Sequence, residues 1–202
     1  MRNELETIKL PEPRYESETS VEEVLLARRS VRDYKNEPLT FEEVSQLLWA
    51  AQGITDKKGS RTAPSAGALY PIEIYVVVGN VDNISEGIYK YKPQGHELVK
   101  VAEGDKRIEL YNAALSQSAV KNAAVAMVFS AVYERTTEKY GKRGERYVHL
   151  ETGHAAQNVY LQTVALDLGT VVIGAFDDNE VKKIMNMQDE EQPLYIMPVG
   201  RK

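Results

Sequence analysis

The sequence predicts an α+β domain in which helices flank a central mixed sheet that is largely antiparallel. Helical patterns and β-branched runs are interspersed along the chain. Residues 87–91 (GIYKY) and 96–101 (HELVKV) are two short segments separated by the turn residues KPQG, which is typical of a β-hairpin. A hairpin pairs its strands in antiparallel fashion, so at least part of the sheet is antiparallel. Residues 123–132 are almost wholly apolar, which predicts a strand buried on both faces.

The first elements of the chain are an extended arm and a short helix. Residues 1–20 carry acidic side chains near Pro11 and Pro13 and predict an arm ahead of the domain at residues 21–202. Such an arm needs a surface to lie on, and a partner subunit is one candidate. Ser20 followed by Glu23 forms a capping box, which predicts a helix over residues 21–28.

The same capping pattern begins the next helix. Thr40 and Glu43 precede apolar residues at helical spacing that run up to Gly53. Residues 55–71 are rich in Gly, Ser, Thr and Pro and predict a loop, and the run EIYVVV at residues 73–78 predicts a strand. Two capped helices therefore flank the segment ARRSVRDYKNEPL.

The second half of the chain predicts three helices and two further strands. The longest helical pattern covers residues 145–168, with Gly169 as its C-cap. Residues 170–176 and 194–200 predict strands, and the other two helices are expected at residues 105–115 and from Asp177, paired with Glu180, through Met185.

Composition excludes several classes of function. The 202 residues contain no cysteine, which rules out disulfides, a thiol nucleophile, iron–sulfur clusters and cysteine zinc sites. The net charge of −5 gives no general attraction to nucleic acid. The N-terminus lacks the apolar core of a signal peptide, and the apolar runs are too short to cross a membrane. We expect a cytoplasmic protein with neither nucleic-acid nor membrane partners.

Known catalytic motifs are absent as well. The sequence has no G-x-G-x-x-G after a strand, no P-loop and no G-x-S-x-G element. His149 and His154 are five residues apart and do not share a helix face, so we expect no metal site.

Cationic side chains gather at two places, around Ser30 and at the end of the chain: Arg28, Arg29, Arg32, Arg201 and Lys202. Arginine forks beside a hydroxyl suit a phosphate ester, because they give charge-assisted and often bidentate hydrogen bonds. The alternative is that the first group complements the dipole of a helix C-terminus and that the second solvates the tail.

The loop T-A-P-S-A-G-A-L-Y-P at residues 62–71 combines small residues with two prolines. Its backbone can approach a planar ligand closely and offer it amide groups. The alternative is an ordinary turn that leads into the following strand.

Five segments follow one another along residues 24–202: R-R-S-V-R-D-Y, P-S-A-G-A-L-Y-P, E-T-G-H-A-A-Q-N-V-Y-L-Q, G-T-V-V-I-G-A-F and P-V-G-R-K. In this order they resemble the nitroreductase-like FMN family, and the chain is most similar to the SagB-type dehydrogenase branch. The resemblance implies an intertwined homodimer with two FMN sites, each built from both subunits. It also implies an oxidoreductase in which the flavin performs the redox chemistry.

The resemblance carries roles over to individual residues. Arg28, Arg29 and Ser30 would hold the phosphate and ribityl end, with Arg201 and Lys202 completing the phosphate site. Arg32 would lie at the pyrimidine edge, where its charge favours the reduced anion. The loop that reaches the flavin from the partner chain would consist of Pro64, Ser65, Ala66, Gly67 and Leu69. The strand end whose backbone amides approach the reactive nitrogen would consist of Gly174 and Ala175.

The same resemblance implies that NADH or NADPH reduces FMN and that a small electrophile, such as a nitroaromatic or a quinone, then takes the hydride. Lys139 and Tyr140 fall where azoline-oxidising members carry a Lys-Tyr pair that can remove a proton. These members are usually longer than this chain, which favours a stand-alone reductase. The alternatives are a charged, solvated loop at this pair, an azoline dehydrogenase in a peptide-maturation complex, or a flavin-binding dimer without turnover.

Further polar and aromatic residues have less specific expectations. Glu151, His154, Gln157 and Asn158 interrupt the apolar pattern of the long helix, and a structural role is expected for each. Gln117 and Asn122 could contact the flavin pocket. Core packing is expected for Trp49, Tyr70, Tyr75, Tyr133 and Tyr160.

Overall fold

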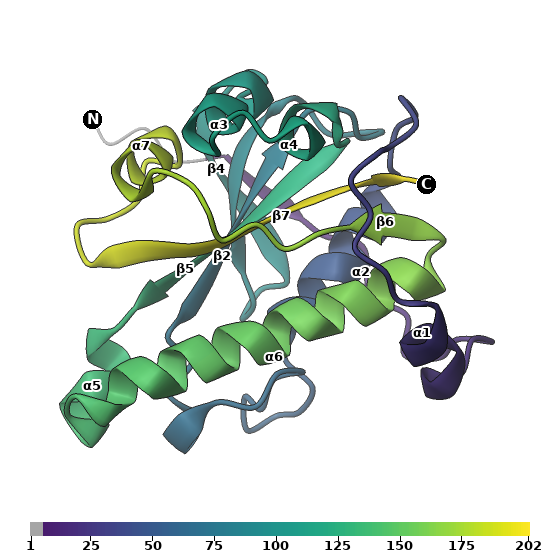
Figure 1. The fold of residues 1–202 in the computed structure, drawn as a ribbon. Coiled ribbons are helices and arrows are strands. Elements are labelled where there is room, and N and C mark those ends of the chain that lie inside the picture. The colour runs from purple at the N-terminus through teal and green to yellow at the C-terminus, as the bar shows by residue number, and fades with distance from the viewer. Residues whose placement is uncertain (1–5) are drawn as a thin grey trace.

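The computed structural model describes residues 6–202 and shows a seven-stranded sheet with helices on both faces (Figure 1). The order of the strands across the sheet is β1-β4-β3-β2-β5-β7-β6. Their bounds are β1 Thr7–Lys9, β2 Ile72–Val78, β3 Gly87–Lys92, β4 Glu97–Glu103, β5 Val125–Val132, β6 Leu168–Thr170 and β7 Glu191–Arg201.

The helices are α1 Val21–Ala27, α2 Phe41–Gln52, α3 Arg107–Ala113, α4 Ser118–Asn122, α5 Glu134–Tyr140, α6 Arg143–Ala165 and α7 Asp178–Ile184. A short 3-10 turn, η1, covers Ala66–Ala68. The sequence did not predict α4 or α5. Within residues 6–202, no helix combines the length and the apolar composition that a bilayer crossing requires.

All strand pairs of the described sheet are antiparallel. The predicted hairpin is β3 and β4, and it lies beside β2, which pairs on its other side with β5. The α+β class and the largely antiparallel sheet are therefore confirmed.

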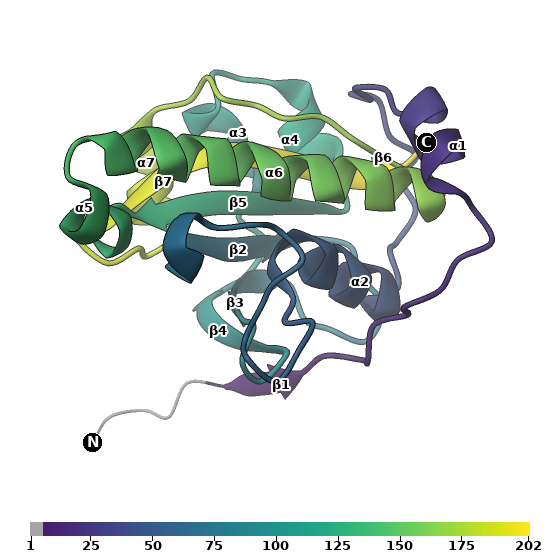
Figure 2. The same ribbon diagram turned by 90° about the horizontal axis from the view of Figure 1, so that it is seen from below.

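Helices cover the two faces of the sheet as separate layers. Figure 1 shows α2 and α6 on one side and α3, α4 and α7 on the other, and Figure 2 shows α6 lying along the sheet. On β2, Ile74 and Val76 face the first layer, whereas Tyr75 and Val77 face the second, because successive side chains of a strand point to opposite faces. Burial on both sides explains why the central strands are almost continuously apolar.

Both predicted capping boxes are present. The Ser20 hydroxyl accepts from the N–H of Glu23, whose carboxylate accepts from the N–H of Ser20 at 2.7 Å. Thr40 and Glu43 make the same exchange at the start of α2. Asp177 likewise caps α7, as its spacing predicted.

Two expectations near the end of α6 are wrong. The helix ends at Ala165 with Leu166 as its C-cap, and Gly169 lies inside β6, where a Cβ atom would come within 2.7 Å of the Val31 side chain. Residues 170–176 do not form a continuous strand. The N–H of Val172 donates to the Tyr160 hydroxyl at 2.8 Å, which interrupts the pairing with β7 until an isolated bridge at Ile173.

The N-terminal arm lies on its own chain. Within residues 6–20, β1 pairs with β4, and the N–H of Arg14 donates to the Gln46 side chain at 2.8 Å. The Gln46 amide donates back to the carbonyl of Arg14 at 3.1 Å, as a neighbouring strand would. Residues 6–20 of the predicted arm thus contact this subunit, and residues 1–5 lie outside the described residues.

Candidate functional site

The loop between α2 and β2 is closed on one serine. The N–H of Tyr70 donates to the Ser65 hydroxyl oxygen at 2.9 Å, and the N–H of Ala68 donates to the Ser65 carbonyl at 3.1 Å. Gly67, Ala68 and Tyr70 have φ angles of 66°, 54° and 47°. Only glycine adopts this region without strain, so the surrounding contacts must hold the other two residues in place.

The structure brings the predicted loop and the predicted Lys-Tyr pair together. A Cβ atom on Gly67 would lie 2.8 Å from the Tyr140 hydroxyl oxygen and 3.0 Å from Lys139 Nζ. The pair belongs to the last turn of α5, so it lies on a helix and not in a solvated loop. Lys139 is exposed and Tyr140 is half-buried. The Lys139 ammonium group and the Tyr140 phenol therefore lie directly against the backbone of Gly67, which has no side chain.

The first cationic group gathers around a tyrosine of α6. The Arg28 guanidinium lies 5.1 Å from the centre of the Tyr160 ring, and the hydroxyl oxygens of Ser30 and Tyr160 are 3.1 Å apart. Arg29 donates to the carbonyls of Leu26 and Arg28 at the end of α1. Tyr160 packs against the core, as expected, and its hydroxyl also joins this group to the backbone of the segment after β6.

The segment that follows the first cationic cluster runs beside the C-terminal strand. The N–H of Lys35 donates to the carbonyl of Arg201 at 2.9 Å, so the segment that follows Arg32 lies against the end of β7. The side chains at the C-terminus have carboxylate partners. Arg201 makes a bidentate ion pair with Glu43, at 2.7 and 2.8 Å, and Lys202 Nζ lies 2.9 Å from an Asp167 oxygen.

Gly174 and Ala175 are exposed in the connection between β6 and α7. The Gln117 amide donates to the Ala175 carbonyl at 3.0 Å, which fixes this backbone from the side of α4. The nearest atom to a Cβ placed on Gly174 belongs to Tyr195, at 3.7 Å, so a side chain there would make an ordinary van der Waals contact without a clash.

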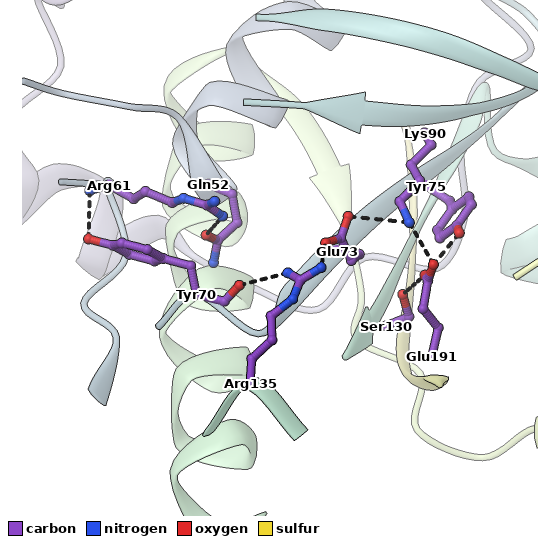
Figure 3. A network of polar contacts seen from close by, with 9 residues as sticks. All are labelled: Gln52, Arg61, Tyr70, Glu73, Tyr75, Lys90, Ser130, Arg135 and Glu191. Atoms are coloured by element: carbon purple, nitrogen blue, oxygen red, sulfur yellow. Dashed lines mark hydrogen bonds and ion pairs between the residues drawn. The ribbon is translucent and has the colours of Figure 1, made fainter. Parts of the chain in front are cut away.

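A polar network, not predicted from the sequence, holds Tyr70 from both sides (Figure 3). The Arg61 guanidinium stacks on the Tyr70 ring at 4.4 Å and donates to the Gln52 side-chain oxygen at 2.9 Å. Arg135, at the start of α5, donates to the Tyr70 carbonyl at 3.1 Å and pairs with Glu73 at 2.6 Å. These contacts explain how Tyr70 keeps its left-handed backbone.

The network continues into the sheet. Lys90 bridges the carboxylates of Glu73, at 3.3 Å, and Glu191, at 2.6 Å. The buried Glu191 also accepts from the hydroxyls of Tyr75, at 2.9 Å, and Ser130, at 3.0 Å. Burial acts to raise the pKa of Glu73, but the two nearby cations outweigh it and hold that pKa below its ordinary value. The loop is therefore anchored to an ionised network at the sheet.

Glu151 lies on α6 beneath the loop and is only 2% exposed. Burial raises the pKa of this carboxyl to about 7, against the opposing effects of Ser65, Arg61 and Gln52. The sequence marked Glu151 as structural, and nothing in its local pattern showed that it would meet the loop. No sequence pattern pointed to Arg61 or Arg135, because their contacts with Tyr70 form only in the folded chain.

The fold and the site together define an α+β protein of the nitroreductase fold. The sequence profile of the Nitroreductase family matches residues 25–201. The chain therefore belongs to the nitroreductase family, as the resemblance of its five segments indicated.

Three relatives show the range of this family. A protein of Methanocaldococcus jannaschii with a provisional nitroreductase name is 51% identical over 185 residues, which are 92% of each chain. A crystal structure from Ralstonia eutropha, also provisionally named a nitroreductase, has a TM-score of 0.85 at 31% identity and covers 96% of this chain and 89% of its own. The Escherichia coli microcin synthetase McbBCD complex, with truncated pro-MccB17 bound, contains a chain that matches with a TM-score of 0.77 at 28% identity, covering 86% of this chain and 68% of that one.

This chain is shorter than the processing proteins that it matches. It spans 54% of the trifolitoxin operon protein TfxC of Rhizobium leguminosarum and 62% of the microcin B17-processing protein McbC.

Proposed function

We propose that this protein is an FMN-dependent oxidoreductase that transfers hydride from NADH or NADPH to a small electrophile, such as a nitroaromatic or a quinone. One observation carries the proposal. The backbone pairing of Lys35 with Arg201 lays the segment that follows Arg32 against the C-terminal strand, which would allow cations of both segments to reach one phosphate. Membership of the nitroreductase family supports the same cofactor class.

The residues present fit a flavin phosphate. Arg28 is half-buried and Ser30 is exposed, so an arginine fork and a hydroxyl are available in one place. Arg201 and Lys202 would complete the phosphate site by exchanging their carboxylate partners for phosphate oxygens. Arg29 would add positive potential while it holds the end of α1. Arg32, which is exposed, would lie at the pyrimidine edge.

When bound, FMN would accept hydride from the nicotinamide donor and pass it to the second substrate. The chain's own residues would position the ring and exclude water. The exposed amides of Gly174 and Ala175 would donate to the ring, held in place by Gln117. The loop of Pro64, Ser65, Ala66, Gly67 and Leu69 would lie against the flavin of the partner subunit, with Lys139 and Tyr140 packed on it at Gly67.

A homodimer is part of this proposal. Large apolar side chains lie exposed on α1 and α6, where Leu26 is 78% exposed. The others are Val21, Leu25 and Leu150. A second copy of the chain would bury these side chains in a symmetric interface.

A second candidate, azoline dehydrogenation in a peptide-maturation complex, is favoured by the contact of Lys139 and Tyr140 with Gly67. The likeness to the McbBCD complex supports it too. In that reaction Lys139 or Tyr140 would remove the proton from the carbon next to the one that loses hydride. The Lys139→Ala and Tyr140→Ala variants would then lose azoline oxidation and keep their flavin, whereas a stand-alone reductase would keep its nicotinamide-dependent activity in both variants.

The test is the visible absorbance spectrum of the purified protein, before and after anaerobic addition of NADH and of NADPH. We expect a flavin spectrum that one donor bleaches and a quinone or nitroaromatic restores. Bound flavin that neither donor reduces would contradict the reductase and support a flavin-binding dimer without turnover. A protein that takes up no flavin would contradict both.

A further inference from the structure

A cavity of about 290 Å³ opens beside the polar network, and the proposed function assigns none of its lining residues to the flavin. It lies where the start of β2, the turn of the β3–β4 hairpin and the loop after α2 meet. Three of its lining residues, Ile72, Ile74 and Tyr91, are buried. The polar and charged residues around it are Gln52, Arg61, Glu73, Lys92, Gln94 and Arg135. The cavity therefore combines an apolar part with a charged wall.

The charges of this wall do not balance. Three of the lining side chains are cations, Arg61, Lys92 and Arg135, and one is an anion, Glu73. The carboxylate of Glu73 is already shared by Arg135, at 2.6 Å, and by Lys90, at 3.3 Å. Figure 3 shows Glu73 beside Arg135, whereas the Arg61 guanidinium lies beside Gln52. The cavity therefore carries an excess of positive charge.

Arg61 is a half-buried cation without a counterion. Among the described residues, no carboxylate forms an ion pair with its guanidinium or with the Lys92 ammonium group. The guanidinium donates to the Gln52 side-chain oxygen at 2.9 Å and stacks on Tyr70, and its other N–H donors have no acceptor in this part of the chain. Burial lowers the pKa of Arg61, against the attraction of Glu73. A guanidinium that has lost water without gaining a counterion favours the binding of an anion.

We propose that this cavity is a second ligand site, which binds the carboxylate or phosphate group of a small anionic molecule. The free donors of Arg61 give the anion charge-assisted hydrogen bonds, and the Lys92 ammonium group approaches it from the hairpin. Arg135 adds positive potential while it keeps its contacts with Glu73 and Tyr70. The volume of about 290 Å³ restricts the ligand to a small molecule.

The site is connected to the loop of residues 64–70 through Tyr70. Arg61 stacks on the Tyr70 ring at 4.4 Å, and Arg135 donates to the Tyr70 carbonyl at 3.1 Å. An anion that holds Arg61 in its stacked position therefore also stabilises the left-handed backbone of Tyr70, which has a φ of 47°. The cavity and its charges do not depend on a flavin, so this inference goes beyond the proposed function and does not rest on it.

The test is titration calorimetry of the full chain with FMN added, using inorganic phosphate and, separately, acetate, at an ionic strength held constant with chloride. We expect one anion per subunit, and the tighter of the two identifies the group that the site prefers. Arg61→Gln should weaken binding by about tenfold or more, because it removes the charge-assisted donors. Lys92→Gln should weaken it a few-fold, and Lys92 has no hydrogen bond or ion pair among the described residues that folding would lose. Arg146→Gln removes a cation at an exposed position of α6 and should bind as the unaltered protein does.

Arg28→Glu separates this site from the proposed phosphate site of the flavin. Anion binding in the cavity should be the same in this variant as in the unaltered protein. Binding that Arg28→Glu abolishes, and that Arg61→Gln and Lys92→Gln leave intact, would overturn the inference. The absence of binding by both anions would overturn it as well. A protein that takes up no FMN but binds an anion through Arg61 and Lys92 would contradict the proposed function alone.

Discussion

The two halves of the proposed flavin site are built in opposite ways. The phosphate end uses exposed or half-buried cations, and Arg201 and Lys202 hold carboxylates that an anion could replace. The loop end is held mainly by half-buried groups: Tyr70 lies between the half-buried Arg61 and the exposed Arg135, and its N–H donates to the half-buried Ser65. We infer that the phosphate end supplies affinity for the cofactor by exchanging carboxylate partners for phosphate oxygens. The loop end supplies a backbone geometry that is fixed before the cofactor binds.

The largest effect is expected at the phosphate end. Arg28→Glu removes a charge-assisted partner of the phosphate and adds repulsion, so FMN affinity should fall by about 100-fold or more. Quenching of flavin fluorescence on binding measures this. Arg146→Glu makes the same change at an exposed position of α6 and should keep the affinity. Equal affinities in the two variants would remove Arg28 from the site.

At the loop end, Glu151 should make the free energy of unfolding depend on pH. The folded-state pKa of Glu151, about 7, lies above its ordinary value of 4.5. The stability contributed by the protonated group is therefore complete below the ordinary value and lost as the pH rises through 7. Relative to the unaltered protein, Glu151→Gln should gain stability between acidic and mildly alkaline pH, by ~3 kcal/mol at most. Urea unfolding at both ends of this window measures it, and a constant difference would contradict the raised pKa.

Alanine substitutions at Gly67 and Gly59 distinguish a steric clash from the cost of a left-handed backbone. Gly67→Ala should destabilise the protein by roughly 1–3 kcal/mol, because it places a Cβ against Tyr140 in a left-handed backbone. Gly59 has a φ of 85°, and a Cβ placed on it would have no atom within 4 Å, so Gly59→Ala carries the backbone cost alone. Denaturant unfolding of both variants compares them. Equal losses would mean that the contact with Lys139 and Tyr140 is not tight.

The smallest effect is expected at the ion pair of Arg201 with Glu43, in which a phosphate would replace the carboxylate. Glu43→Gln keeps the cap of α2 but releases the charge held by Arg201, so FMN affinity should rise a few-fold while stability falls by about 1 kcal/mol or less. Titration calorimetry with FMN and a parallel unfolding curve measure the two quantities. A drop in affinity would show that the ion pair orients Arg201 for its ligand and does not compete with it.

Much of the fold could be predicted from the sequence because its signals are local. The capping boxes at Ser20 and Thr40 and the hairpin of β3 and β4 each depend on neighbouring residues. The expectation of one strand over residues 170–176 failed because the Tyr160 hydroxyl, from another element, takes the N–H of Val172. The expectation for Gly169 failed because this residue lies in β6 against the Val31 side chain. A distant contact of this kind leaves no periodic pattern.

The candidate site divides in the same way. The segments of Arg28 and Gly67 were recognised as motifs, and the structure brings Gly67 to Lys139 and Tyr140. The roles assigned to these residues remain predictions. Arg135 could not be found, since it meets Tyr70 across 65 positions of sequence. Glu151 was noticed as polar, but its raised pKa comes from burial that only the fold creates.

The central claim is that arginines from both ends of the chain hold one phosphate. The most direct measurement compares the affinities of FMN and riboflavin, which differ by that phosphate, for the unaltered protein and for Arg28→Glu. We predict that the unaltered protein binds FMN about 100-fold or more tightly than riboflavin, and that this preference collapses in the variant while riboflavin binding changes little. Equal affinity for the two flavins in the unaltered protein would contradict the account.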